Sequence, residues 1–548
     1  MQRPRFEAVP HNPVNDSVPC LSSKDEDKWT AVCACSTEVS LDLFEVALLQ
    51  LVHHPEYNST LILRSDIIEE TEDPAEISKC VPVLKGMKPI KNIHRKLLPR
   101  RPGRDPSIEQ HCTFYSAESD ATSELPPPSC LILTPIVEGG AQLPYYHPAV
   151  HHIAFRYLQG SGDDSQRIRI EVITLPDAPD PADINSRLYR TCLALLETLH
   201  RYCWGALTNY KKRVQHDCLV SREEYQDLYL ILREKYKHLV EQWQEATDPL
   251  KHVFEDIGIA TYLMLLWKQG IFIGESAIGG TSQSDGIEAP WHSWPRPQAG
   301  FLDFGCGNGL LVHILVSEGY HGHGIDVRAR TSWAHYPPGT TQAHLHVHAL
   351  DPLLIGTHLP GEGEEFFEES EPLLSTSEGV VFLQKGTFII ANHADELTPW
   401  TPVLATLCGA SGYLSIPCCS WTFDVKFEKP RIREYDTFFE TKLSGDRRKD
   451  ANEEAFIESL NLGGDAGSSS SAYSVYRIWL AKLSSYCGWK IECENLRIPS
   501  TRNWAIIGRR RDKEDNTEII RRSRWILDRV KEREMFKTRK PEGKAGDH

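Results

Sequence analysis

Short apolar runs alternate with helical patterns in the C-terminal half of the chain. The runs FLDFG, GHGID and GTFIIANH are typical of buried strands, because each is compact, apolar and bounded by turn residues. Further strands are predicted at HLHVHAL, GYLSIPC, WKIECENLRI and NWAIIG. This alternation of strands with helical segments predicts an α/β domain built on a doubly wound sheet, over residues 271–510.

The N-terminal half shows other patterns. Residues 1–28 are polar, rich in proline and without periodicity, so we expect a flexible leader there. Over 29–181, the helical stretch SLDLFEVALLQLV accompanies the strand candidates STLILRSDII, SCLILTPIV and RIRIEVITL, which predicts a mixed α/β domain. From 182 to 270 the period is that of helices, and a helical connector is predicted. Its clearest stripe, expected to pack as core, comprises Tyr225, Leu228, Leu232, Tyr236, Leu239 and Trp243.

Two polar stretches interrupt the predicted α/β domain. They lie near 361–379 and 444–471, are rich in Gly, Ser and charged residues, and are expected to be mobile surface loops. The chain ends in residues 511–548, which are predicted to form a basic helix or tail.

Composition narrows the class of protein. A chain of 548 residues with 40% hydrophobic and 25% charged residues is long enough for several domains, which excludes a small peptide. It has no run of eighteen apolar residues and its first thirty residues lack the apolar centre of a signal peptide, so neither a membrane span nor secretion is expected. The 15 cysteines are irregularly spaced, which favours reduced thiols and a cytoplasmic or nuclear location.

Charge is segregated along the chain. The formal net charge is -16, but residues 497–548 carry 16 Lys or Arg against 9 Asp or Glu. Residues 85–104 contain eight Lys or Arg and no acid, and their prolines exclude a continuous helix, so a basic loop is predicted. Both clusters are candidate phosphate-binding surfaces, with solvated surface cations as the alternative for each residue. The candidates are Arg95, Lys96, Arg100, Arg101, Arg497 and Arg502.

A glycine-rich turn carries the most specific chemistry. Asp303 ends a predicted strand, and the sequence GCGNG that follows contains Gly305, Gly307, Asn308 and Gly309 before the helical pattern LLVHILVSEG. Glycines let the chain bend tightly and let a ligand approach the amides at the start of a helix. This arrangement predicts a nucleotide cradle, for which a purely structural turn is the alternative.

Two features favour S-adenosylmethionine over a dinucleotide. The dinucleotide fingerprint needs a third glycine where this chain has Leu310, and Asp303 suits a ligand with an ammonium and a sulfonium but no phosphate. Asp326 ends the next strand, where a carboxylate can accept hydrogen bonds from both ribose hydroxyls, with a helix cap as the alternative. Asp351, at the end of the third strand, is either a contact to the adenine amino group or a turn residue before Pro352.

The exit of the fourth predicted strand is the expected acceptor side of the site. Ligands of a doubly wound sheet bind beyond the carboxyl ends of the strands, so ANHADELTPW and IPCCSW should face the transferable methyl. A helix is predicted to begin at Thr398, and the turn before it comprises Asn392, His393, Asp395 and Glu396. Each of these side chains can meet substrate, and the alternative for the two acids is a favourable interaction with the helix dipole.

Neither the cysteines nor the histidines form a recognisable metal motif. Cys418 and Cys419 lack a second close pair with histidines at zinc spacing, so buried thiols are favoured. His344, His346 and His348 share one face of a strand without a carboxylate companion, which favours solvated or hydrogen-bonded rings. No metal is expected.

Longer segments of the chain resemble a known family. FLDFGCGNGLLVHILVSEGYHGHGIDVRARTSW, ANHADELTPWTPVLA, SIPCCSWTFD and LRIPSTRNWAIIG are similar to segments of the tRNA (uracil-2'-O-)-methyltransferases that modify uridine 44 of serine tRNA. Upstream, HHPEYNSTLILR, RKLLPRRPGRD and KHVFEDIGIATYLMLLWK resemble the accessory regions of that family. The resemblance implies a class I, Rossmann-like methyltransferase core, S-adenosylmethionine as donor, a ribose 2'-hydroxyl as acceptor and a cytoplasmic location. It assigns the cofactor role to Asp303, Gly305, Gly307, Gly309 and Asp326.

The resemblance leaves the proton acceptor open. The strand exits have no lysines where the Lys-Asp-Lys-Glu set of other ribose methyltransferases requires them, and no cysteine follows Cys493, so a zinc finger like that of some relatives is not expected. Since the turn after the fourth strand lies nearest to the expected methyl position, we predict Asp395 as the base, with Asn392 and His393 orienting the ribose. The alternative functions are a class I methyltransferase acting on a nucleobase or a protein, and a noncatalytic RNA-binding scaffold.

Overall fold

The structure is a computed structural model in which the chain forms two compact units, 1–211 and 212–548, described here one at a time. It describes residues 5–12, 18–23, 28–77, 81–118, 126–137, 142–160, 166–209, 216–270, 289–357, 374–375, 381–435, 437, 455, 460, 471–511, 515–534 and 536–537. Most of the stretches near 361–379 and 444–471 that were expected to be loops lie outside these ranges. Among the helices described, none has the length and apolar character that crossing a membrane requires.

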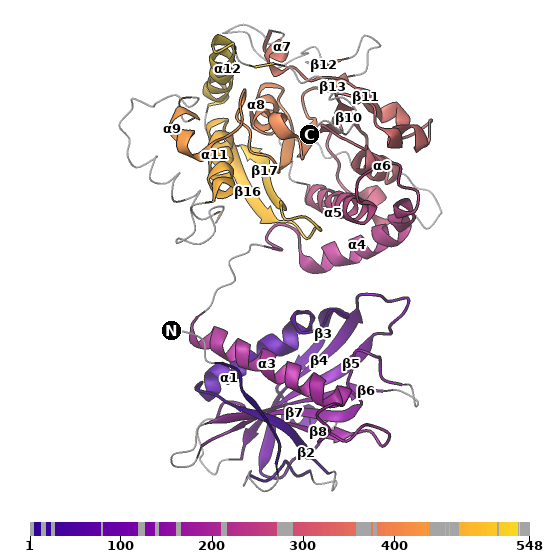
Figure 1. The fold of residues 1–548 in the computed structure, drawn as a ribbon, viewed down its shortest axis with the longest axis vertical. Helices are drawn as coiled ribbons and strands as arrows, with labels where there is room; N and C mark the ends of the chain where they lie inside the picture. Colours follow the sequence, from indigo (N-terminus) through magenta and orange to yellow (C-terminus); the bar gives the residue numbers. More distant parts are fainter. Residues whose placement is uncertain are drawn as a thin grey trace. The chain divides into compact units, whose positions relative to one another are not determined.

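An antiparallel sheet of eight strands, in the order β1-β2-β8-β7-β6-β5-β4-β3, forms the first unit (Figure 1). Its long helices α1 and α3 pack on one face of the sheet, where apolar side chains of alternate strand positions meet the buried stripe of each helix. The elements are β1 (Ala8–Pro10), β2 (Thr30–Ser36), α1 (Leu41–His53), β3 (Ile62–Thr71), α2 (Pro74–Ile77), β4 (Met87–Pro99), β5 (Ile108–Ala117), β6 (Cys130–Ile136), β7 (Val150–Leu158), β8 (Arg167–Thr174) and α3 (Arg187–Leu207).

The predicted connector over 182–270 is wrong as a unit of its own. Its first helix, α3, buries Leu188, Leu196 and Leu199 against the sheet of the first unit, whereas its later helices belong to the second unit. Helical periodicity predicted all of these helices, but it does not tell which sheet receives an apolar stripe.

The predicted flexible leader is partly wrong. Residues 8–10 pair with β2 as an edge strand, and Leu21 is buried against the sheet face opposite the helices. The guanidinium of Arg169, fully buried, donates hydrogen bonds to the carbonyl oxygens of Val18 and Pro19 at 2.8 and 2.9 Å. A proline-rich segment has few amides to offer a sheet but keeps its carbonyls, and here these oxygens are its attachment.

The predicted basic loop over 85–104 is also wrong, because most of it is the 13-residue strand β4 inside the sheet. The prolines that exclude a helix are compatible with this strand: Pro89 lies where the pairing with β5 shifts register, and Pro99 is the last residue. Side chains alternate across the sheet, so Arg95 points inward and is 3% exposed. Its guanidinium donates to Gln110 and to the carbonyl of Val52, so it cannot meet a phosphate.

A seven-stranded sheet, in the order β11-β10-β9-β14-β15-β17-β16, forms the second unit (Figure 1). The first five strands of that order are parallel to their neighbours, and β17 and β16 are antiparallel. The strands are β9 (Phe301–Phe304), β10 (Gly322–Asp326), β11 (Leu345–Val347), β14 (Phe388–Asn392), β15 (Gly412–Ile416), β16 (Trp489–Asn495) and β17 (Trp504–Arg511), and a separate pair consists of β12 (Leu374–Ser375) and β13 (Val381–Leu383). All seven strands of the main sheet lie on the apolar runs that predicted them.

Helices cover both faces of this sheet. Successive residues of β9 and β14 point to opposite faces, so that Phe301 and Phe388 join one core and Leu302 and Ile389 the other. The helices are α4 (Arg222–Tyr236), α5 (Pro249–Lys268) and α6 (Leu310–Ser317) on the first face, and α7 (Pro352–Thr357), α8 (Trp400–Leu407), α9 (Ile432–Tyr435), α11 (Ala472–Tyr486) and α12 (Asn516–Glu532) in the remainder of the unit.

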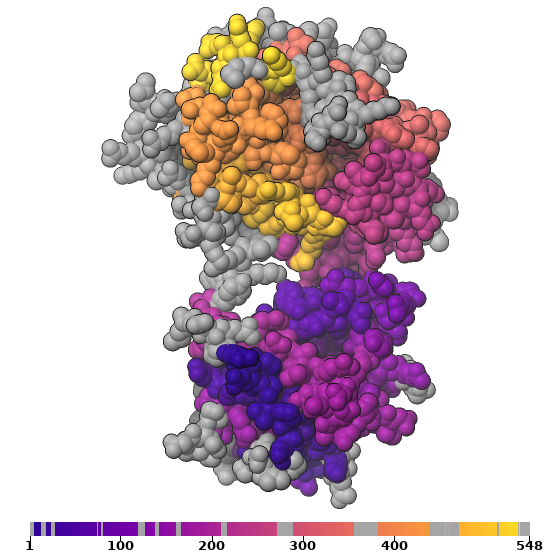
Figure 2. All heavy atoms as spheres, in the orientation of Figure 1, coloured from indigo at the N-terminus to yellow at the C-terminus, as the bar shows by residue number. Residues whose placement is uncertain are grey.

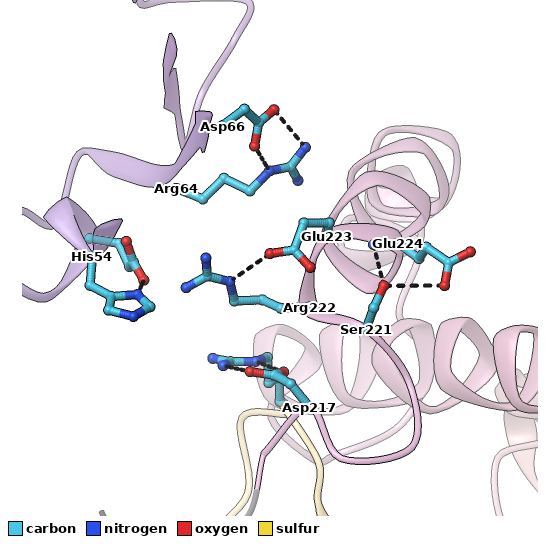
Figure 3. A network of polar contacts seen from close by, with 10 residues as sticks. His54, Arg64, Asp66, Asp217, Ser221, Arg222, Glu223 and Glu224 are labelled. Atoms are coloured by element: carbon cyan, nitrogen blue, oxygen red, sulfur yellow. Dashed lines mark hydrogen bonds and ion pairs between the residues drawn. The ribbon is translucent and has the colours of Figure 1, made fainter. Parts of the chain in front are cut away.

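Capping residues fix the start of two helices in the second unit. Ser221 accepts a hydrogen bond from the amide of Glu224 at the start of α4 (Figure 3), and Asp248 caps α5 in the same way.

The last helix of the chain, α12, packs against α7 and α8, and its yellow atoms lie beside the salmon atoms of the segment around α7 in Figure 2. The predicted basic C-terminal helix is therefore an integral layer of this unit.

Candidate functional site

The glycine-rich turn joins β9 to α6. Gly305, Gly307 and Gly309 all have left-handed backbones, with φ of 67°, 53° and 77°. A Cβ atom at position 309 would lie 2.8 Å from a methyl of Leu345 and 3.2 Å from the indole nitrogen of Trp333, so the third glycine is required by space as well as by conformation. Neighbouring side chains therefore pack tightly against the turn at Gly309, whereas a Cβ atom at Gly305 or Gly307 would have no neighbour closer than 3.8 Å.

Asp326, at the end of β10, ties this turn to the next strand. One carboxylate oxygen accepts the amide of Gly307 at 3.0 Å, and the other accepts the amide of Arg328 at 3.2 Å. Each oxygen has a second lone pair. The carboxylate is therefore oriented for further donors, as a ribose ligand must be.

These groups line one side of a hollow of about 360 Å³ at the carboxyl end of the parallel strands. Eight of the residues predicted for the site lie in its wall: Asp303, Gly305, Gly307, Asn308, Asp326, Asn392, His393 and Asp395. Gly309 is not in the wall and acts on the turn instead. Asp351 is also absent from the wall, and its carboxylate accepts the amide of Leu353 at the start of α7, as expected for the alternative turn role.

Helix α5 supplies wall residues that the sequence did not predict. Glu255 and Asp256 lie in a helix of otherwise apolar character, EDIGIATYLMLLW, and both carboxylates reach the hollow while being at most 9% exposed. Two adjacent acids within an apolar helical run were the available signal, because charges of this kind are rarely buried without a partner.

Buried acids dominate the electrostatics of the hollow. Asp303 is 2% exposed and its Oδ1 has no hydrogen-bond partner within the described part of the chain. Burial, and then the negative charges of Asp256 and Asp326, raise the pKa of Asp303 well above its usual range. Burial and the charge of Glu255 do the same to the pKa of Asp256. Such a site favours a cation.

The tight turn after β14, which the sequence predicted to face the acceptor, lines a further part of the hollow. His393 and Asp395 have left-handed backbones, with φ of 55° and 45°, and non-glycine residues adopt this conformation mainly in constrained turns. His393 Nε2 lies 3.1 Å from Glu255 Oε1, and Asn392 presents a buried side-chain oxygen without a partner among the described residues. The helix predicted to start at Thr398 begins at Trp400, since residues 395–397 already form a 3-10 turn.

The two adjacent cysteines after β15 belong to this same side. Cys418 Sγ donates to Asp395 Oδ1 at 3.5 Å, and one donor atom from each of Asp395, Cys418 and Cys419 lies within 4.8 Å of the others. Burial raises the pKa of the Cys418 thiol, so it stays protonated and can act as the donor. The expectation of two buried thiols is wrong, because Cys419 is exposed and Cys418 is only half-buried.

Comparison with known proteins now adds to this geometry. The first unit matches the family model described as "TRM44-like, N-terminal bet v1-like domain" over residues 7–213. The second matches "Predicted AdoMet-dependent methyltransferase" over 219–278 and 292–352. A curated tRNA (uracil-O(2)-)-methyltransferase of Schizosaccharomyces pombe is 34% identical, over 88% of this chain and 85% of its own. Proteins of the same name from Neurospora crassa and Saccharomyces cerevisiae are 32% and 30% identical, over 93% and 85% of this chain and 92% and 84% of their own.

The chain belongs to the tRNA (uracil-O(2)-)-methyltransferase family. The predicted family membership is confirmed, and so is the expectation that S-adenosylmethionine is the methyl donor. The methyltransferase combines this α/β unit with a bet v1-like domain, where the sequence had predicted only a mixed α/β domain.

A second, smaller hollow of about 40 Å³ lies against the first in this methyltransferase, since both are lined by Gly305, Asp326 and Glu396. Its remaining wall is largely apolar and includes Ile325, Leu350 and Phe536. Phe536 comes from the segment after α12, and its ring contacts the indole of Trp400 edge-on at 5.6 Å. The C-terminal segment thus contributes to the edge of the site, which no motif in the sequence indicated.

The two C-terminal arginines predicted to bind RNA differ in their surroundings. Arg497 forms a two-pronged ion pair with Asp217, which is labelled in Figure 3. Arg502 is exposed and its guanidinium lies over the ring of Tyr473, 3.9 Å from the centroid. The Tyr473 hydroxyl donates to the carbonyl of Pro417, next to the two cysteines. Arg502 therefore lies near the two cysteines after β15, whereas Arg497 is already paired with an acid.

Proposed function

We propose that this protein transfers a methyl group from S-adenosylmethionine to the ribose 2'-hydroxyl of uridine 44 in serine tRNA, in the cytoplasm. The α/β unit would be a class I, Rossmann-like core, which its strand order and parallel pairing support. One observation carries the proposal. A single hollow at the carboxyl end of the strands is lined both by buried acids that favour a cation and by the turn of Asn392, His393 and Asp395. The names of its relatives supply the nucleic-acid class and the modified atom.

The residues present fit S-adenosylmethionine in one orientation. Asp303 would bind the methionine ammonium, the amides of Gly305, Gly307 and Asn308 would lie along the ligand, and Asp326 would accept the ribose hydroxyls. The apolar second hollow next to Asp326, lined by Leu350 and Phe536, would form one side of the adenine site, in place of Asp351. When bound, the cofactor supplies an electrophilic methyl carbon attached to a sulfonium.

The acceptor turn would position and deprotonate the ribose hydroxyl. Asp395 accepts the proton as the oxygen–carbon bond forms. The Cys418 thiol donates a hydrogen bond to Asp395 Oδ1 and so fixes the orientation of the carboxylate. Asn392 and His393 orient the ribose, and Glu255 holds the imidazole of His393. The proposal uses no metal, because the Cys418 thiol acts here as a hydrogen-bond donor.

RNA binding would use the exposed cations. Arg502 beside the acceptor side, and Lys96, Arg100 and Arg101 at the end of β4 in the first unit, are the candidates that remain. Lys96 is 41% exposed and 3.6 Å from Glu109, and Arg100 donates to the carbonyl of Ile62 but is exposed. Arg497 would have to exchange Asp217 for a phosphate, so we rank it behind Arg502.

Product mapping tests the proposal. Purified protein, unmodified serine tRNA transcript and labelled S-adenosylmethionine should yield 2'-O-methyluridine at position 44 by mass spectrometry, and a transcript with 2'-deoxyuridine there should yield none. A methylated base, or a methylated protein, would instead indicate another class I methyltransferase. Binding of the tRNA without any uptake of cofactor would indicate a scaffold.

Asp395→Asn tests the assignment of the base. Single-turnover rates with saturating cofactor should fall by about 100-fold or more, because general-base assistance is removed while the shape is kept. Glu396→Gln removes a charge from the same turn and should change the rate by less than about tenfold on that scale. Equal rates for Asp395→Asn and the wild type would exclude Asp395 as the base.

A further inference from the structure

Helix α5 delivers two consecutive acids to the wall of the larger hollow. Glu255 pairs with His393 on the acceptor side, at 3.1 Å. Asp256 also lines the hollow, and its charge raises the pKa of Asp303. The helix therefore serves both halves of the site through neighbouring residues.

Nothing in the described part of the chain neutralises Asp256. Its carboxylate has no ion pair or hydrogen bond there, and the charge that most affects its pKa, after burial, is the negative one of Glu255. Asp303 likewise has an unpartnered Oδ1, and the charges that shift its pKa, those of Asp256 and Asp326, are both negative. Two buried carboxylates without a cation disfavour the ligand-free state, and a ligand that brings positive charge relieves both.

We propose that Asp256 is a second ligand, beside Asp303, for the α-ammonium of S-adenosylmethionine, which makes the site selective for the amino-acid part of the cofactor. This inference rests on the proposed function. An ammonium has three N–H donors, which one carboxylate cannot all accept in good geometry, so a second carboxylate on a different element completes its coordination. The sulfonium adds a further positive charge nearby.

The position of Asp256 within α5 supports a ligand role over a structural one. It lies in the second turn of a 20-residue helix whose following residues, from Ile257 to Trp267, are all buried. An aspartate there caps no helix end and bonds no described side chain, so the fold gains nothing from its charge.

Three ligands separate the two ends of the cofactor. S-adenosylhomocysteine has both the amino acid and the adenosine, its des-amino analogue lacks only the amine, and methylthioadenosine lacks the whole amino acid. Calorimetry on the wild type should show the des-amino analogue binding about 10- to 100-fold more weakly than S-adenosylhomocysteine, the range for charge-assisted hydrogen bonds. This measurement needs no variant.

Asp256→Asn then assigns the effect. It should weaken S-adenosylhomocysteine by about tenfold or more, while its affinity for methylthioadenosine stays that of the wild type, which also shows a folded pocket. Phe536→Ala is the matched contrast at the adenine end and should weaken both ligands by the same factor. Equal losses for both ligands in Asp256→Asn, or no loss for either, would overturn the inference.

Failure of the inference is distinguishable from failure of the proposed function. If the wild type binds none of the three ligands, the proposed function fails with it. If the wild type binds S-adenosylhomocysteine and methylates tRNA, but Asp256→Asn shows no ligand selectivity, only the role of Asp256 is excluded.

Discussion

The two units treat buried charge in opposite ways. In the first unit, Arg169 and Glu171 are both fully buried but bond each other at 2.7 Å, and Glu171 also accepts the amide of Leu21 at 2.7 Å. In the second unit, the buried carboxylates of Asp256 and Asp303 have no such partners in the described part of the chain. Satisfied charges of the first kind hold a fold together, whereas unpartnered buried carboxylates of the second kind are suited to binding a cation.

Breaking the satisfied pair should have the largest effect. Glu171→Ala leaves the guanidinium of Arg169 buried with only part of its bonds, and should lower the free energy of unfolding of the first unit by about 3–5 kcal/mol. Urea unfolding followed by a probe in that unit measures the change. A loss below about 1 kcal/mol, as for a surface pair, would mean that the network is not structural.

The unsatisfied acid should respond in the opposite direction. Asp303→Asn imitates the protonated carboxyl, so it should raise the melting temperature of ligand-free protein by about 2–4 °C while weakening cofactor binding. The sign follows from the pKa: a carboxyl whose folded pKa is raised keeps its stability at low pH and loses it as pH rises. The gain should therefore grow between pH 5 and pH 8. A lower melting temperature for Asp303→Asn throughout this range would contradict the assignment.

A third arrangement is a pair of half-buried histidines that favours the neutral ring. His323 lies 3.0 Å from His346 at the edge of the parallel sheet, and burial followed by that neighbour lowers the pKa of His323 to about 3. The unfolded chain gains its proton first as pH falls below the ordinary value near 6.5, so stability is lost from there downward. His323→Gln should reduce the fall in melting temperature between pH 7 and pH 5 by about 2–4 °C. An unchanged fall would mean that this pair is protonated in the folded state.

Substituting exposed cations should have the smallest effect on the stability of the protein, but a measurable effect on its affinity for RNA. Replacing Lys96, Arg100 and Arg101 by glutamine should reduce the slope of log affinity for tRNA against log salt by about 0.7–0.9 for each phosphate that the variant no longer neutralises. Arg190→Gln, an exposed cation of α3 outside this cluster, is the control. An identical slope in both proteins would remove the cluster from the interface.

Sequence patterns predicted the strands of the second unit well and the basic strand of the first poorly. Apolar runs such as FIIAN can only be buried strands in an alternating pattern, and their exits located Asp326 and the turn at His393. In β4, lysines and prolines hid the alternation, because half of its side chains reach solvent and Arg95 is buried through polar partners. Asp256 could have been suspected from two adjacent acids in an apolar helical run, but nothing in local spacing showed that it lines the hollow. Phe536 left no such signal, because it comes from a segment distant in sequence.

Glu255 and Asp256 are consecutive residues of helix α5, and this has a consequence for engineering. Two residues further along, Gly258 is in contact range of both Tyr225 and Ile498: a Cβ atom there would stand 2.9 and 2.8 Å from their side chains. A side chain larger than that of glycine at position 258 would therefore displace helix α5. A substitution at Gly258 would then move Glu255 and Asp256 together, and cofactor binding and ribose positioning should change in the same variant, unlike in a substitution of Asp256 itself.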